Sequence, residues 1–188
     1  RVKDPRLWYA PWLRKGQHAS MAGLATSGTL THWFREHFAK DLTLETSFGE
    51  LSKEAALSAP GANGLVFLPY FSGERTPIHD PDAKGVLFGL RLDHTRGDIY
   101  RGLIEGIAVG TRHVVDTFVE SGTKTNQFFA VGGGTKNELW LQTTSDITGF
   151  DQIVREKTVG ASYGDAFLAA LALGTVSYTH LTLPTTML

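Results

Sequence analysis

The chain has 188 residues, of which 41% are hydrophobic and 20% charged, with a formal net charge of -1 and no cysteine. This composition is typical of a globular protein with a substantial core, and it excludes a disulfide scaffold and a thiolate metal site. The near-neutral balance gives no support for nucleic acid or an anionic membrane surface as a partner. No apolar run is long enough to span a bilayer, so we expect a cytoplasmic protein.

The first fifty residues predict a hairpin and two helices. Residues 7–26 read as two short strands joined by a turn at Lys15 and Gly16. Apolar residues at helical spacing predict a helix in "SGTLTHWFREHFA". In "SFGELSKEAALSA", Ser47 with Glu50 three positions later is a capping-box pattern, and it predicts the start of a second, short helix.

The middle of the chain predicts a buried strand, a long loop and a long helix. "GLVFLPYF" is a compact apolar run after a turn signal, which favours a buried strand. Residues 72–90 are rich in glycine and proline and read as a loop, and a loop of this length is usually functional or disordered. Thr95 with Asp98 forms a second capping-box pattern, and the helix that it begins should stop at Gly122.

The last third alternates strand and helix. Residues 126–134 read as a strand that runs into three glycines, and a helix follows from about Lys136 to Gly149. A short strand, "DQIVRE", precedes an alanine-rich helix whose small residues favour close packing. Paired early strands followed by this alternation predict an α/β domain with a mixed sheet flanked by helices. Residues 175–188 lack any Asp, Glu, Lys or Arg and read as an atypical tail, suggestive of a foreign sequence.

The glycine run in "VGGGTKNELW" is the first candidate site. Gly132, Gly133 and Gly134 let the backbone turn sharply and let a ligand lie against it, and the helix start beyond them offers free N–H groups suited to phosphate. The run matches neither the G-x-G-x-x-G spacing nor a P-loop. The residues alone leave a purely structural turn and a ligand site equally open.

A second glycine turn lies in "LPYFSGERTP". Gly73 follows an apolar run, and two glycine turns at the ends of separate strands can face each other across one cleft. The alternative is an ordinary surface loop in which Glu74 and Arg75 are solvated.

Metal and hydrolase chemistry fit the sequence poorly. His79, Asp80 and Asp82 invite a metal interpretation, but their spacing fits neither a helical His pair nor an EF-hand loop. Asp80 is better interpreted as ordering its loop through bonds to backbone N–H groups. The chain has no G-x-S-x-G elbow, which argues against a serine hydrolase. We therefore assign no metal-ligating residue.

Taken together, the motifs resemble one known family. In chain order they are "GLVFLPYFSGERTPIHDPDAKGVLFGL", "RGLIEGIAVGTRHVVD", "VGGGTKNELWLQTTSDITG" and "ASYGDAFLAAL". This order is similar to the C-terminal domain of the FGGY carbohydrate kinases over about residues 8–174, and "SGERTP" favours the xylulokinase-like members. The resemblance implies an actin-like ATPase, ribonuclease-H-like fold. An unrelated α/β module, in which the glycine runs are only turns, is the alternative.

The resemblance also implies a nucleotide site. By matching motif positions, Gly73 would lie by the phosphates of ATP or ADP, Gly133 and Asn137 would contact the nucleotide, and Gly132 and Gly134 would shape the turn. Mg²⁺ would be bound mainly through the nucleotide.

The family's catalytic aspartate, its N-terminal phosphate loop and most of its sugar site would precede Arg1. The resemblance therefore implies an N-terminally truncated nucleotide-binding domain over residues 1–174, with no catalytic residue in this chain. Its sugar substrate, a ketopentose such as xylulose, would bind to the missing N-terminal domain, and the chain alone would be inactive. A homodimer is compatible with the family. A non-catalytic actin-like nucleotide-binding or regulatory domain is the alternative, and an upstream aspartate would distinguish the two.

Overall fold

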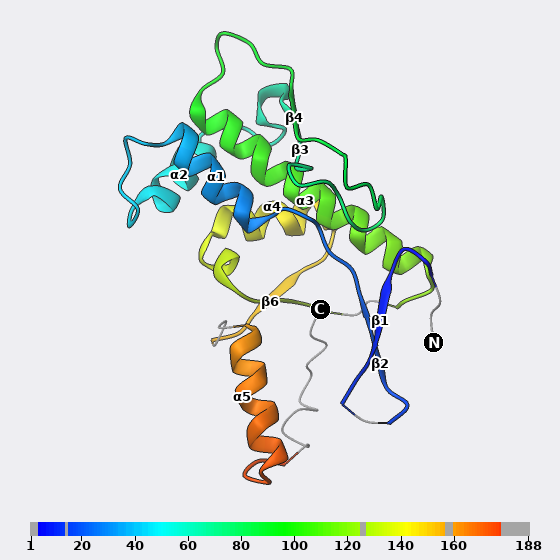
Figure 1. Ribbon diagram of the computed structural model, residues 1–188. Coiled ribbons are helices and arrows are strands. Elements are labelled where there is room, and N and C mark those ends of the chain that lie inside the picture. The colour runs from blue at the N-terminus through cyan, green and yellow to red at the C-terminus, as the bar shows by residue number, and fades with distance from the viewer. Residues whose placement is uncertain (1–3, 14, 125–126, 157–159, 178–188) are drawn as a thin grey trace.

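The computed structural model describes residues 4–13, 15–124, 127–156 and 160–177 (Figure 1). In chain order its elements are β1 (Trp8–Pro11), β2 (His18–Met21), α1 (Gly28–Phe38), α2 (Ser47–Ala56), η1 (Ala62–Gly64), β3 (Val66–Leu68), β4 (Val86–Phe88), α3 (Arg96–Glu120), β5 (Phe128–Ala130), η2 (Gly133–Lys136), α4 (Glu138–Thr148), β6 (Gln152–Val154) and α5 (Ala161–Ala172).

The long helix α3 is the centre of the fold. Helices α1, α2 and α4 and strand β3 all pack against it, and Figure 1 shows it crossing the upper part of the molecule as a diagonal. The buried apolar core is drawn from α1, α2, β3 and α3, and it consists of Leu30, Phe34, Ala39, Leu51, Ala55, Phe67, Tyr100, Leu103, Ile104 and Ile107. Removal of this surface from water is the main force that holds the four elements together.

The predicted ends of α3 are confirmed. Thr95 and Asp98 form the expected capping box, and Gly122 follows the helix with φ of 85°. The carboxylate of Asp98 also accepts hydrogen bonds from Ser58 Oγ and Asn63 Nδ2, both at 2.6 Å. The hydrogen bond from Ser58, followed by those from Thr95 and Asn63, holds the pKa of the Asp98 carboxyl far below its usual range.

The strands pair as three separate two-stranded sheets. β1 and β2 are antiparallel, with Trp8 opposite Met21, so the predicted hairpin is confirmed. β3 and β4 are antiparallel, and β5 and β6 are parallel, with Phe128 opposite Gln152. The predicted α/β class with both kinds of pairing is therefore confirmed, although the described strands are divided among three pairs.

The structure differs in part from two predictions for residues 64–90. β3 is buried on one face only, because Phe67 is 5% exposed whereas its neighbours Val66 and Leu68 are 52% and 37% exposed. Alternate residues point to opposite faces of a strand, and α3 covers only the inner face. The segment read wholly as loop contains β4, which pairs with β3.

The capping box predicted at the start of α2 was also wrong. Ser47 is already helical and buried, and its hydroxyl donates to the carbonyl of Leu44 at 3.2 Å. Glu50 does not reach back to the helix start, since its carboxylate pairs with Lys53 at 2.7 Å.

Helix α5 forms where it was predicted, but the close packing expected of its small residues is not seen. None of its residues is buried, and Figure 1 shows it projecting away from the α1–α4 body. Of the atypical tail, residues 178–188 lie outside the described part of the chain. Among the described helices, none combines the length and the apolar character needed to cross a bilayer.

Candidate functional site

The glycine turn between β5 and α4 is the local structure from which the site is built. Gly132 has φ of 88°, a conformation that favours glycine, and residues 133–136 continue as a 3₁₀ turn. Gly133 is different, because its φ is not positive and a Cβ built on it would have no atom within 4 Å. Nothing in the described fold therefore requires glycine at position 133, and the backbone there is open to an approaching group.

Asn137 fixes the start of α4. Its side-chain Oδ1 accepts a hydrogen bond from the backbone N–H of Trp140 at 3.1 Å, which makes it the N-cap. Within the described residues its Nδ2 has no partner, nor do the backbone N–H groups of Glu138 and Leu139. The N-terminus of α4 therefore presents several free donors at the positive end of the helix dipole.

These donors lie at the wall of a cavity of about 880 Å³. This volume falls within the range of about 300–1,000 Å³ typical of small-molecule sites. From the glycine turn and α4 the lining includes Gly133, Gly134, Asn137, Leu139 and Trp140. The opposite wall comes from α1 and α2 and includes Gly28, Thr31, His32, Phe48, Gly49 and Ser52.

Aromatic side chains make up much of the cavity lining. His32 and Phe48 meet edge to face with ring centroids 4.9 Å apart, which joins α1 to α2. Tyr100 reaches the cavity from α3, and burial raises its pKa to about 12, so its hydroxyl stays protonated at neutral pH. A flat heterocycle such as a nucleobase suits walls of this kind, while the donors of α4 suit an anion.

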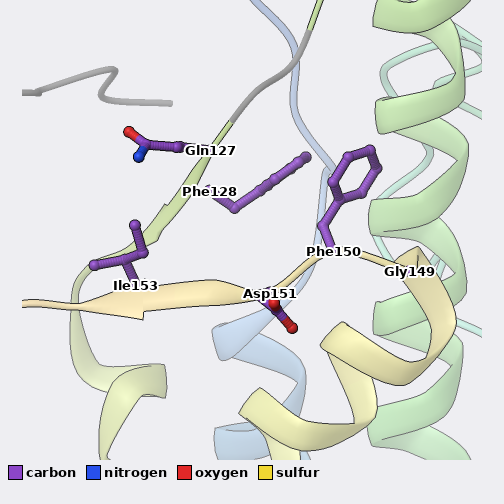
Figure 2. A pocket seen from close by; sticks show the side chains of 6 residues that line it. All are labelled: Gln127, Phe128, Gly149, Phe150, Asp151 and Ile153. Atoms are coloured by element: carbon purple, nitrogen blue, oxygen red, sulfur yellow. The ribbon is translucent and has the colours of Figure 1, made fainter.

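A second cavity, of about 450 Å³, lies beside the pair β5–β6 (Figure 2). It is lined by Gln127, Phe128, Gly149, Phe150, Asp151 and Ile153. Gly149 ends α4, so this cavity faces the negative end of the helix dipole and carries the carboxylate of Asp151. Both features disfavour an anionic ligand. The larger cavity is also lined by two carboxylates, those of Glu45 and Glu138, but two lysines and the positive end of α4 offset them, so it is the better candidate.

The structure separates the predicted site residues into two groups. Gly133, Gly134 and Asn137 line the larger cavity, and Gly132 shapes the turn behind them without lining it. Gly73 is not among the lining residues. It has φ of 73°, and a Cβ there would come within 2.7 Å of Pro81 Cα, so its own loop already requires glycine.

The loop that holds Gly73 is tied to the segment that leads into α1. Buried Glu74 accepts a hydrogen bond through Oε1 from the backbone N–H of Ala25 at 3.0 Å, and its own backbone pairs with Asp80. Asp80 accepts from the N–H of Asp82 at 2.8 Å, which confirms its interpretation as a loop-ordering residue. Among the described residues, no cluster of His, Asp and Glu is suited to hold a metal ion.

The sequence reasoning missed the wall made by α1 and α2. Neither Phe48 nor His32 was among the predicted site residues. The available signal was Gly28 at the first position of α1 with polar Thr31 and His32 on the turn that follows. This signal is weak, because Thr31 is buried and its hydroxyl donates to the carbonyl of Gly28 at 2.7 Å.

Comparison with known proteins assigns this architecture to a family. The family model described as the C-terminal domain of the FGGY family of carbohydrate kinases matches residues 9–173. A xylulose kinase of Staphylococcus epidermidis is 37% identical over 156 residues, which are 82% of this chain and 30% of the relative. The chain thus spans about a third or less of the length of such relatives.

Solved structures agree with the sequence match. The crystal structure of xylulose kinase from Rhodospirillum rubrum superposes with a TM-score of 0.80 at 34% identity, over 91% of this chain and 34% of that one. That of Plasmodium falciparum glycerol kinase with ADP superposes with a TM-score of 0.68 at 27% identity, over 85% of this chain and 30% of that one. The predicted actin-like ATPase, ribonuclease-H-like fold is confirmed by these neighbours.

Proposed function

Because the chain belongs to the FGGY family of carbohydrate kinases, we propose that it is the nucleotide-binding part of an ATP-dependent sugar kinase. The whole enzyme would transfer the γ-phosphoryl group of ATP to a sugar hydroxyl. The xylulose kinases among the similar proteins favour a ketopentose such as xylulose as the substrate. The observation that carries the proposal is the cavity that joins an open glycine turn to the free N-terminus of α4.

Each part of the cavity has a role in this proposal. The backbone at Gly133 would let the phosphate chain approach closely, and the free N–H groups of Glu138 and Leu139 would donate to anionic oxygens. The aromatic wall formed by His32 and Phe48 would hold the base. Since the Oδ1 of Asn137 is occupied by the cap, Asn137 would contact the nucleotide through Nδ2.

Phosphoryl transfer depends mainly on positioning and on stabilisation of charge, which this arrangement is suited to supply. Mg²⁺ would be held by phosphate oxygens and water, because the cavity offers no cluster of carboxylates among its described residues. The catalytic base and the sugar site would belong to the two thirds of the relatives that this chain does not match. We therefore expect the 188-residue chain to bind nucleotide without phosphorylating sugar.

Calorimetric titration of ADP with Mg²⁺ into the 188-residue chain tests the proposal. Asn137→Ser keeps an oxygen for the N-cap but removes the amide donor, so ADP affinity should fall by about tenfold while the melting temperature holds. Gln127→Ala removes an amide from the second cavity and should leave the affinity unchanged. The proposed site would be contradicted if the folded wild-type chain did not bind ADP. It would also be contradicted if Gln127→Ala lowered the ADP affinity and Asn137→Ser did not.

A further inference from the structure

Two lysines line the larger cavity, and they differ in their partners. Lys53 on α2 is held by Glu50, with Nζ 2.7 Å from Oε1. Lys136, the last residue of the 3₁₀ turn, makes neither an ion pair nor a side-chain hydrogen bond within the described ranges of the chain. The cavity therefore contains one lysine whose charge is already paired and one whose charge is available.

The position of Lys136 is unfavourable for a cation by itself. It directly precedes Asn137, the N-cap of α4, where the helix dipole repels positive charge. Glu138 lies in the first turn and offsets part of this repulsion, but its carboxylate is not paired with Lys136. An anion placed between the lysine and the free N–H groups of α4 would be attracted by both, against the opposing charge of Glu45 and Glu138, which line the same cavity.

We propose that Lys136 binds the phosphoryl oxygens of the nucleotide and makes the cavity select nucleoside phosphates over uncharged nucleosides. This inference rests on the proposed function, since it assigns a residue within the same site. Lysine suits the role because its ammonium is a compact point charge on a flexible stem, which can follow a phosphate chain without a fixed geometry. The rival interpretation is a solvated surface lysine with no ligand.

Binding of ADP and of adenosine to Lys136→Gln, with Lys53→Gln as the matched control, tests the inference. Both variants lose one positive charge from the same cavity, so a long-range electrostatic effect would act on both. Lys136→Gln should lower the affinity for ADP by about fivefold, the effect of one solvent-exposed ion pair, and leave the affinity for adenosine within about twofold of wild type. Lys53→Gln should leave both ligands within about twofold, and Lys136→Arg should restore ADP binding.

Each other outcome has a definite meaning. Unchanged ADP affinity in Lys136→Gln would overturn the inference, as would an equal loss in Lys53→Gln, which would indicate bulk charge. An equal loss of ADP and adenosine would also overturn it, because the lysine would then shape the cavity instead of binding phosphate. If the folded wild-type chain bound adenosine and ADP with equal affinity, phosphate recognition would be refuted but a nucleoside site would remain. If it bound neither ligand, the proposed function itself would be refuted.

Discussion

Gly106 and Gly102 offer a paired test of how α3 packs. Both are buried in the same helix. A Cβ at Gly106 would overlap the carbonyl oxygen of Phe67 and lie 3.2 Å from its carbonyl carbon, so β3 would have to move. A Cβ at Gly102 would meet only the side chains of Ala62 and Leu65, at 3.5 and 3.6 Å, which is ordinary contact.

The two alanine variants should therefore change stability in opposite directions. Replacement of a helical glycine by alanine gains about 1 kcal/mol from helix propensity. Gly102→Ala should keep this gain in stability. In Gly106→Ala the methyl group would be overpacked against the backbone of β3, and the cost of about 3 kcal/mol should exceed the gain. We expect Gly102→Ala to raise the free energy of unfolding by about 1 kcal/mol and Gly106→Ala to lower it by about 2 kcal/mol.

Urea denaturation followed by circular dichroism measures both changes. Thermal denaturation gives a second measure. The two variants should differ by about 3 kcal/mol, and at about 2–4 °C per kcal/mol for a chain of this size their melting temperatures should differ by about 6–12 °C. Equal stability of Gly106→Ala and Gly102→Ala would refute the close approach of α3 to β3. A loss at Gly102 with a gain at Gly106 would mean that the register of α3 on β3 is wrong.

The remaining predictions concern Asp98, the residue that caps α3 and ties it to Ser58 and Asn63. Asp98→Asn should lower the free energy of unfolding by about 2 kcal/mol at pH 7, because buried hydrogen bonds to a charged group are lost. The pKa of Asp98 is depressed in the folded state from a value of 3.8, so its stabilisation is complete above that value and is lost as pH falls. The difference in the free energy of unfolding between wild type and Asp98→Asn, measured by urea denaturation, should thus be constant from pH 5 to 7 and shrink below about pH 4. A difference that stayed constant down to pH 2 would argue against the depressed pKa.

The helices could be predicted from sequence where local chemistry determined them. Thr95, Asp98 and Gly122 set the ends of α3 through their own hydrogen bonds and backbone conformation, and all three were identified correctly. The role of Ser47 was not, because a Ser-x-x-Glu pattern specifies a cap only when the serine precedes the helix. Here the N-cap position is Thr46, and Ser47 is the first residue of α2. The cap position depends there on tertiary packing, which buries Ser47.

The strands and one wall of the site depended on contacts distant in sequence. β4 is a strand only because β3 lies beside it, and the glycines and prolines around it carry a loop signal. Likewise, the glycine turn could be read as a candidate site, but His32 and Phe48 became part of it only because α1, α2 and α4 all pack against α3 and line one cavity. A single sequence contains no local signal for such a meeting of elements.

If the glycine turn before α4 receives the phosphates of a nucleotide, as proposed, Gly133→Ala should block binding without disturbing the fold. The fold has room for this methyl group, so stability should be unchanged, but the methyl would occupy the path of the ligand. Calorimetry should show ADP affinity reduced by at least about tenfold. Gly164→Ala, at an equally open position in α5, should leave ADP affinity unchanged. Unaltered ADP binding by a folded Gly133→Ala chain would show that the phosphates do not lie against this turn.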